Sequence, residues 1–280
     1  MNYLRAHKSF LAQLFVCVIL AVLLTVTLLT YRRTLQLLKR QTHGVYGATS
    51  SQGRPADPSL RAMLSIAHNK FSIPLKGIIH IGAHHAEELD LYREKGFKNI
   101  LWIEANPKHE TVLRENTKHH RGSQVAIFAA SAEEGSALLH VPVQHTRCAS
   151  LLRPKNLTRA VKTTAQQERF LVKKTPLDSF FAQMQNKTAY NAMLVDIQGF
   201  ELEALKGSVK TLQNIDFLIT EVSWNNTYYD GGCAIGELDR FLGTHGFVRL
   251  ETHIDNRFVD GDALYIKKHI VENHLHTDQY

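Results

Sequence analysis

Short apolar runs that alternate with helical segments are the feature that most constrains the fold of this 280-residue chain. Within each run, apolar residues follow one another without polar alternation, which is typical of strands covered on both faces. Helix signals lie between the runs. Residues 86–95 are predicted to be helical, and Asn106-Pro107 supplies an N-cap and a first-turn proline. Strands joined by helices predict right-handed βαβ crossovers, and therefore an α/β fold with a doubly wound, mostly parallel sheet. The predicted strands are residues 77–82, 100–104, 125–130, 193–197 and 217–222.

The end of the chain departs from this pattern. The last two predicted strands, residues 247–253 and 263–267, flank the turn signal Asp255-Asn256 and indicate an antiparallel hairpin. The segment 141–174 fits the alternation least well, and it carries eight Lys and Arg residues against the single acid Glu168. A charge run of this kind is usually a solvated excursion from the domain.

An uncharged apolar run near the N-terminus predicts one transmembrane helix ahead of the α/β domain. No charged residue occurs between Ser9 and Tyr31, and about 20 helical residues span the roughly 30 Å hydrocarbon layer. A cleaved signal peptide is the alternative, but its apolar region is usually about 7–15 residues long and ends in small residues. The predicted organisation is an N-terminal tail at 1–9, an anchor in the lipid bilayer at 10–30, a basic flank and flexible stem at 31–59, a folded domain at 60–270 and a C-terminal tail at 271–280.

The distribution of charge argues against nucleic acid as a partner. The net charge is +7, but residues 1–55 hold seven basic residues and no acid, whereas 26 basic and 26 acidic residues lie between positions 56 and 280. The excess therefore flanks the predicted anchor and the folded domain is neutral. A nucleic-acid-binding domain would carry a net basic surface instead.

Two signals bear on membrane orientation and they disagree. Basic residues on both sides of the apolar run lean towards a cytosolic domain. Three N-glycosylation triplets, at Asn156, Asn186 and Asn225, could be used only by a luminal domain. A short tail, an anchor, a stem and a domain in this order resemble a type II membrane protein of the Golgi or endoplasmic reticulum, so we expect a luminal domain, with a cytosolic one left open.

Polar residues at predicted strand ends mark the candidate site, because ligands of open α/β sheets bind at the carboxyl ends of the strands. Gly82 follows the first strand, but the two later glycines of a dinucleotide-binding loop are missing, which argues against NAD and FAD. Glu104 ends the next strand, about where an acid would bind a ribose diol. Asp196 and Glu221 end two further apolar strands. Any one of these acids could be a helix cap or an ion-pair partner, whereas several at one edge indicate a site.

Three motifs give the chain a resemblance to the FkbM-type family of S-adenosylmethionine-dependent methyltransferases. They are Gly77-Ile-Ile-His-Ile-Gly-Ala-His84, Trp102-Ile-Glu-Ala-Asn-Pro107, and Asp196-Ile-Gln-Gly-Phe-Glu201 with Leu205-Lys-Gly207. The resemblance covers about residues 76–268. It implies a Rossmann-like class I methyltransferase fold, a seven-stranded sheet with an antiparallel last strand, S-adenosylmethionine as cofactor, and O-methylation of sugars or similar hydroxyl compounds. Two departures are His80, where many relatives have an acid, and His84-His85.

The resemblance also implies roles for individual residues. Gly82, Ala83 and His84 would form the loop beneath the methionine part of the cofactor. Glu104 would bind the ribose hydroxyls, which agrees with the strength of charge-assisted hydrogen bonds. Ser131 would lie near the adenine.

Asp196 is the first candidate for the general base that activates an acceptor hydroxyl, Glu201 is the second and His145 the third. The alternative is that Asp196 positions the cofactor or a helix terminus and that Glu201 is structural. No pair of the 16 histidines has the spacing of metal ligands, so we expect no metal. Segment 141–174 would lie on the acceptor side and could bind an acidic glycan.

The sequence thus predicts a membrane-anchored O-methyltransferase. The alternative from another class is a membrane-tethered binding module that keeps the fold without transfer activity. A different Rossmann-like enzyme that uses a nucleotide is a third, weaker interpretation, because the glycines it would need are missing.

Overall fold

The computed structural model describes residues 57–155, 167–185, 189–225, 228–255 and 260–277. The predicted anchor at 10–30, the stem up to residue 56, and the triplets at Asn156 and Asn186 lie outside these residues. Within the described part of the chain, no helix has the length and apolar character needed to cross a membrane. The anchor therefore stays a prediction.

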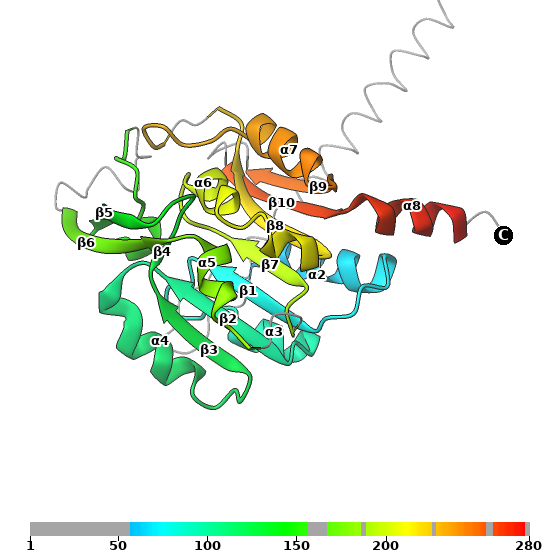
Figure 1. Cartoon of the computed structure of the whole chain (residues 1–280), viewed down its shortest axis with the longest axis horizontal. Helices are drawn as coiled ribbons and strands as arrows, with labels where there is room; N and C mark the ends of the chain where they lie inside the picture. Colours follow the sequence, from blue (N-terminus) through cyan, green and yellow to red (C-terminus); the bar gives the residue numbers. More distant parts are fainter. Residues whose placement is uncertain (1–56, 156–166, 186–188, 226–227, 256–259, 278–280) are drawn as a thin grey trace, which may run out of the picture. The chain divides into compact units, whose positions relative to one another are not determined.

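A seven-stranded sheet forms the centre of the domain (Figure 1). Its order is β3-β2-β1-β7-β8-β10-β9, and β10 runs antiparallel to both of its neighbours while the other neighbouring pairs are parallel. This arrangement confirms the predicted mostly parallel sheet and the terminal hairpin. The strands are β1 Gly77–Ile81, β2 Asn99–Glu104, β3 Ser123–Ile127, β7 Ala192–Val195, β8 Phe217–Ser223, β9 Phe247–Asp255 and β10 Asp260–Lys267.

Helices cover both faces of this sheet, as the non-alternating apolar strands require. One face of the sheet packs against α5 Leu177–Ala182, α6 Glu201–Lys206 and α7 Ile235–Thr244. The other face packs against α2 Pro58–Ser65, α3 Leu89–Lys95 and α4 Glu110–Thr117. Neighbouring residues of β1 illustrate the division, because Ile79 belongs to the first cluster and Ile78 to the second, and both are fully buried. Each such side chain contributes about 1.5–3 kcal/mol through burial.

Three local predictions differ from the structure. The predicted strand 125–130 divides, because Ala129–Ala130 forms β4 in a separate three-stranded sheet with β5 Gly135–Pro142 and β6 Gln167–Thr175. The last eight residues of the segment 141–174, which fitted the alternation least well, thus belong to strand β6. The helix predicted from Ala86 begins only at Leu89, since Ala86 has a φ of 60° that no α-helix accommodates. The predicted tail is helical as far as residue 277, in α8 Lys268–Thr277.

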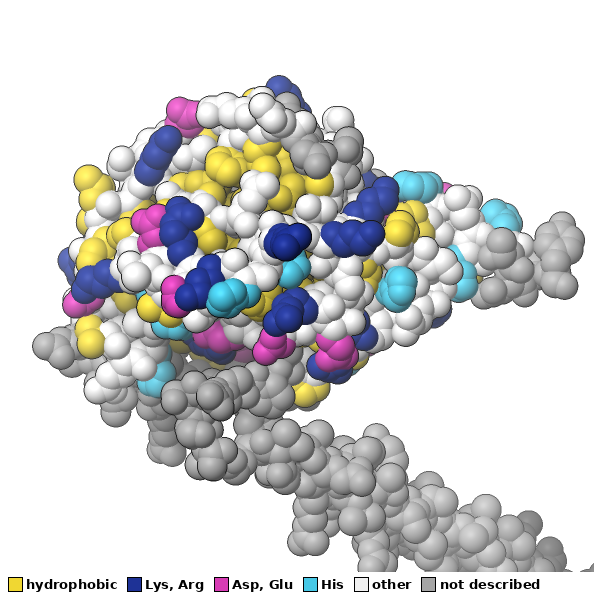
Figure 2. Space-filling model, turned by 90° about the horizontal axis from the view of Figure 1, so that it is seen from below, with side chains coloured by type: hydrophobic (Ala, Val, Ile, Leu, Met, Phe, Trp, Pro, Cys, Tyr) yellow, Lys and Arg dark blue, Asp and Glu magenta, His cyan; other side chains and the backbone are white. Residues whose placement is uncertain are grey.

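Charges of both signs are interspersed on the face of the domain seen in Figure 2. Several charged side chains of the described residues form ion pairs on the surface of the domain, such as Arg114 with Glu110 at 2.8 Å and Lys108 with Glu168 at 2.7 Å. This surface fits the neutral sum of charges between residues 56 and 280.

Candidate active site

The candidate site begins where β1 and β7 end side by side. Ile81 and Val195 are partners in the parallel register, so Gly82 and Asp196 follow at the same edge of the sheet. Gly82 has a φ of 94°, and a Cβ atom at this position would lie 1.9 Å from the carbonyl oxygen of Asp196. Only glycine permits both the left-handed backbone and this contact. The predicted cofactor loop and the predicted base are therefore adjacent.

Glu104 at the end of β2 organises the loop after β1. Its Oε2 accepts a 2.7 Å hydrogen bond from the amide of His84, and its Oε1 accepts one of 2.7 Å from the amide of Asn106. Burial raises the pKa of Glu104, although these two backbone donors act in the opposite direction. Each carboxylate oxygen has a further lone pair, so Glu104 can still accept hydrogen bonds from a ribose diol, as predicted.

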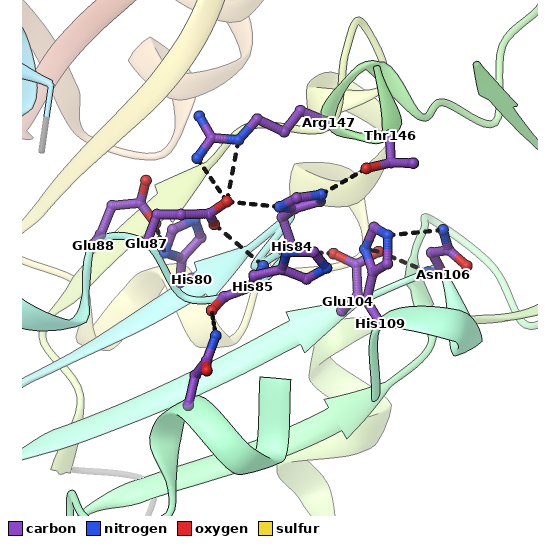
Figure 3. Close-up of polar contacts among 11 residues, drawn as sticks. His80, His84, His85, Glu87, Glu88, Glu104, Asn106, His109, Thr146 and Arg147 are labelled. Carbon is purple, nitrogen blue, oxygen red and sulfur yellow. Dashed lines mark hydrogen bonds and ion pairs between the residues drawn. The ribbon is translucent and has the colours of Figure 1, made fainter. Parts of the chain in front are cut away.

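His84 connects this loop to the segment after β5 (Figure 3). It has a φ of 42°, and its Nδ1 contacts Oε1 of Glu87 while its Nε2 contacts the hydroxyl of Thr146, both at 2.8 Å. Arg147 forms an ion pair of 2.6 Å with the same oxygen of Glu87. These interactions lower the pKa of Glu87 against the effect of its burial. The short helix η3 Thr146–Cys148 is thereby held over the loop.

These elements surround a cavity of about 50 Å³ at the carboxyl edge of the sheet. Its wall combines polar and charged side chains, such as those of Glu104 and Asp196, with apolar ones from β4 and from Phe128. Four of the predicted site residues line it, namely Gly82, His84, Glu104 and Asp196. A cofactor with a charged end, a ribose and a base fits a wall of this kind, and the absence of a side chain on Gly82 leaves room for close backbone approach.

Two predicted cofactor residues contribute through the backbone instead of lining the cavity. The amide of Ala83 donates to the carbonyl of Ile103 at 3.0 Å, which holds the loop against β2. Ser131 is buried, and its carbonyl lies so close to Gly207 that a Cβ on this glycine would be 1.9 Å away. The residues that do line the cavity at the end of the third strand region are Ala129 and Ala130.

The structure separates the three candidates for the base. Asp196 is exposed and lines the cavity. Glu201 is buried, and its Oε1 accepts 3.0 Å hydrogen bonds from the amides of Ile197 and Gly199. It therefore supports the turn into α6, which agrees with the structural alternative. His145 is exposed and precedes the cavity-lining Thr146 without lining the cavity itself.

Sequence reasoning missed Gln198, which connects the acids at this edge. Its Nε2 donates to Oδ1 of Asp196 at 2.8 Å and lies 3.0 Å from both carboxylate oxygens of Glu221. The hydroxyl of Tyr229 donates to its Oε1 at 3.1 Å. Burial, followed by the charge of Asp196, raises the pKa of Glu221 well above its usual value. Gln198 has a φ of 59°, and nothing in the sequence marks a glutamine for that conformation.

A second feature without a sequence signal is the contact of three imidazoles. The rings of His84 and His85 lie 3.9 Å apart between centroids, and His109 lies 4.4 and 4.6 Å from them. His109 is 24 positions away from His85 in the sequence. It reaches the loop because η2 Pro107–His109 begins directly after β2.

The fold and the cavity agree with the Rossmann-like class I methyltransferase fold that the sequence resemblance implies. The sheet order with its antiparallel β10, the glycine after β1 and the acid after β2 are the features that carry this assignment. The sequence matches the family described as the methyltransferase FkbM domain over residues 80–249, which is more than half of the chain, and the chain belongs to this family. Its cofactor is S-adenosylmethionine, as predicted.

Solved methyltransferase structures are similar at low identity. Precorrin-6y C5,15-methyltransferase from Geobacter metallireducens GS-15 is 12% identical, with a TM-score of 0.40, over 79% of this chain and 92% of that chain. The 1,6-didemethyltoxoflavin-N1-methyltransferase of Burkholderia thailandensis is 8% identical, with a TM-score of 0.42, over 76% and 79%. Sp1610 of Streptococcus pneumoniae, in complex with S-adenosyl-L-methionine, is 11% identical, with a TM-score of 0.43, over 74% and 72%. No curated protein matches the sequence.

Proposed function

We propose that this chain is a membrane-anchored O-methyltransferase that acts on a hydroxyl group of a carbohydrate or a similar metabolite. The observation that carries the proposal is the position of Asp196, whose exposed carboxylate lines the cavity beside the cofactor loop at Gly82. A sugar hydroxyl is a poor nucleophile at neutral pH, so a carboxylate within reach of it adds about 10²–10⁴ to the rate.

Different residues of the chain have different roles in the transfer. When bound, S-adenosylmethionine supplies a methyl group activated by its positively charged sulfur. Glu104 and the Gly82 loop orient the cofactor, and the wall of the cavity aligns the acceptor for in-line attack. Asp196 takes the proton of the acceptor hydroxyl as the hydroxyl oxygen bonds to the methyl carbon and the carbon–sulfur bond breaks. The products are a methyl ether and S-adenosylhomocysteine.

Two features of the same edge favour a sugar-like acceptor, and one with negative charge. Trp224 follows β8 and is 53% exposed, and an exposed indole offers both an apolar face and a polar N–H group to a ligand. Arg147 lines the cavity. Other exposed cations of segment 141–174 lie near Arg147 in the sequence. They suit an acidic or sulfated glycan better than a neutral one.

We place the domain in the lumen of the Golgi or endoplasmic reticulum, held by residues 10–30 as a single-pass type II anchor. The uncharged run from Ser9 to Tyr31 supports the anchor. Asn225 in the third glycosylation triplet is exposed, as an acceptor of N-glycans has to be. Sensitivity of the expressed protein's mobility to an N-glycosidase would support this placement, and resistance together with protease accessibility from the cytosol would overturn it.

The enzymatic proposal is tested on the full chain in detergent. Calorimetric titration with S-adenosylmethionine comes first, because a chain that does not bind it is a binding module with this fold and not an enzyme. Release of S-adenosylhomocysteine is then measured with neutral and sulfated oligosaccharides, and the product is examined for a methyl ether by mass spectrometry. Asp196→Asn should lower kcat about 100-fold or more and leave cofactor affinity within a factor of about two. An unchanged kcat would exclude Asp196 as the base.

A further inference from the structure

The three imidazoles of His84, His85 and His109 form a cluster beside the cofactor cavity. One ring nitrogen from each histidine lies within 4.8 Å of the other two. Figure 3 shows the rings coming together from the loop after β1 and from the start of the helix after β2. Around tetrahedral zinc, with bonds of about 2.0–2.1 Å, ligand nitrogens are about 3.4 Å apart. The ring nitrogens therefore need to approach one another by up to about 1.4 Å to share one cation.

His109 contributes a buried nitrogen that has no partner. Its Nδ1 makes no hydrogen bond within the described part of the chain, and its residue is 6% exposed. The nearest carboxylate oxygen, Oε1 of Glu104, is 3.9 Å away, beyond hydrogen-bond distance. An orphaned polar atom inside a protein costs about 1–3 kcal/mol. A bound cation would remove this cost.

His84 is already oriented as a metal ligand. Its Nδ1 donates to the carboxylate of Glu87 at 2.8 Å, which leaves the lone pair of Nε2 for an electrophile. In this structure Nε2 contacts only the hydroxyl of Thr146, at 2.8 Å. A carboxylate behind a histidine is the usual outer partner of zinc ligands. The ring of His85, partly exposed, has no hydrogen bond among the described residues, so its nitrogens are also available.

We propose that His84, His85 and His109 bind one divalent transition-metal cation of the zinc class. Imidazole nitrogen suits zinc, copper, nickel and cobalt, whereas magnesium and calcium require oxygen ligands that the cluster does not supply. Three histidines leave the fourth position of a tetrahedral ion for water or another ligand. The site shares His84 with the lining of the cofactor cavity, but its existence does not depend on the proposed acceptor or on Asp196.

The residues around His109 suggest a substitution that should strengthen metal binding. The Oδ1 of Asn106 accepts from the amide of Lys108 at 3.1 Å, which turns its Nδ2 towards Nε2 of His109 at 3.3 Å. A metal bound to Nδ1 requires the ring proton of His109 to be on Nε2. The Nδ2 group of Asn106 is itself a donor, so it cannot accept a hydrogen bond from this proton. Asn106→Asp keeps the cap to Lys108 and supplies an acceptor for the proton. The variant should therefore bind the metal more tightly than the wild type.

The test uses the full chain, purified without a histidine tag and stripped with a chelator, in the absence of cofactor. Titration calorimetry with Zn²⁺ should show one ion per chain, and Co²⁺ should give the visible absorption of a tetrahedral complex. His85→Gln and His109→Gln should each weaken Zn²⁺ binding about 100-fold or more, since even outer-shell changes cost about 10–100-fold. His119→Gln is the matched control, because it removes an exposed imidazole outside the cluster.

A thermal readout guards against a variant that fails to fold. Zn²⁺ should raise the melting temperature of the wild type and, by a larger amount, that of Asn106→Asp, because a ligand that binds only the folded state stabilises it. His85→Gln, at a partly exposed position, should fold and lose this effect. Undiminished Zn²⁺ binding by His85→Gln and His109→Gln, or a wild type without tetrahedral Co²⁺ absorption, would overturn the proposal and leave three imidazole rings in contact without a metal.

Discussion

The amide of His84 donates a 2.7 Å hydrogen bond to Oε2 of Glu104, across 20 positions of sequence. This bond joins the end of β2 to the loop after β1, and the carboxylate itself lines the cavity. One side chain therefore shapes the cofactor loop and is available to the ribose hydroxyls. A substitution of Glu104 can affect both roles, which makes the choice of variant important.

We expect Glu104→Gln to weaken S-adenosylmethionine binding about 10–100-fold, because hydrogen bonds to a charged acceptor contribute about 1.5–3 kcal/mol. Glutamine keeps the volume of the side chain and one acceptor oxygen, so it retains one of the two backbone hydrogen bonds and turns its NH2 group towards the other amide. Urea unfolding of the same variant reports what this loss costs the fold. Titration calorimetry measures the affinity. Glu251→Gln, at a partly buried position on β9, is the control with the same change of charge. Equal affinities for the two variants would show that Glu104 does not bind the cofactor.

Gly82→Ala tests the contact between the cofactor loop and β7. The new methyl group would overlap the carbonyl oxygen of Asp196, at 1.9 Å, so the loop or the strand end has to move. Gly96→Ala is a matched control, because Gly96 has a similar φ of 87° and nothing within 4 Å of the added atom. We expect Gly96→Ala to cost about 1–2 kcal/mol of unfolding free energy and to keep cofactor binding. Gly82→Ala should cost more and lose cofactor binding; equal losses in urea unfolding would contradict the close contact.

Glu88 should make stability depend on pH. Burial raises its pKa to about 7, and the neighbouring imidazole of His80, 3.9 Å away, is neutral because burial lowers the pKa of that histidine to about 3. The folded state thus holds a proton that the unfolded state releases near pH 4.5. The stability that this bound proton contributes is fully present below about pH 4.5 and is lost as the pH rises to about 7.

We therefore expect Glu88→Gln to be more stable than the wild type above pH 7, by about 1–3 kcal/mol, with the difference shrinking towards pH 4.5. Urea unfolding at a series of pH values measures it. Glu251→Gln is the control with the same change of charge, at a side chain that is 40% exposed. A difference for Glu88→Gln that grows as the pH falls would contradict the assignment.

If the acceptor is acidic, reversing the charge of exposed cations in segment 141–174 should selectively raise the KM for the acceptor. Several basic residues of this segment are engaged in ion pairs, such as Lys174 with Glu133 at 3.1 Å. The exposed positions suited to reversal to glutamate are Arg153, Arg169 and Lys173. The triple variant should raise KM for a sulfated oligosaccharide about 10-fold or more and leave KM for S-adenosylmethionine unchanged.

The control for this variant reverses the same amount of charge elsewhere. The positions are Lys98, Arg121 and Arg240, all exposed. This protein should keep the KM of the wild type for the sulfated oligosaccharide at physiological salt, where distant charges are screened. Parallel changes in both triple variants would indicate a general effect of net charge, and no change in either would exclude an electrostatic acceptor site.

Much of the fold was predictable because burial on both faces leaves a plain signal in the sequence. Strands β1, β2, β7 and β8 are apolar runs, and the acids that end β2 and β7, Glu104 and Asp196, line the cavity as expected. Periodicity did not predict that Ala129 and Ala130 belong to a separate sheet, because a short apolar stretch has the same sequence pattern in either sheet. Contacts of side chains from distant segments, such as His109 with His84 or Thr146 with His84, depend on tertiary packing and left no local pattern.

Gln198 is the residue whose role was hardest to predict from local sequence patterns. We expect two substitutions of Gln198 to have the same effect on catalysis and different effects on stability. Its amide holds Asp196 and Glu221 in place, while its φ of 59° strains the backbone. Gln198→Ala and Gln198→Gly remove the same hydrogen bonds. Both should lower kcat by a similar factor, about 10-fold or more, with the cofactor Kd unchanged, since Asp196 loses its orientation.

The two variants should differ only in stability. Glycine adopts a positive φ without strain, so Gln198→Gly should be more stable than Gln198→Ala by about 1 kcal/mol. Steady-state kinetics and urea unfolding of the same preparations measure both quantities. If activity followed stability across the pair, Gln198 would act through the fold of the turn alone. Equal kcat at unequal stability would instead identify it as the residue that positions the base.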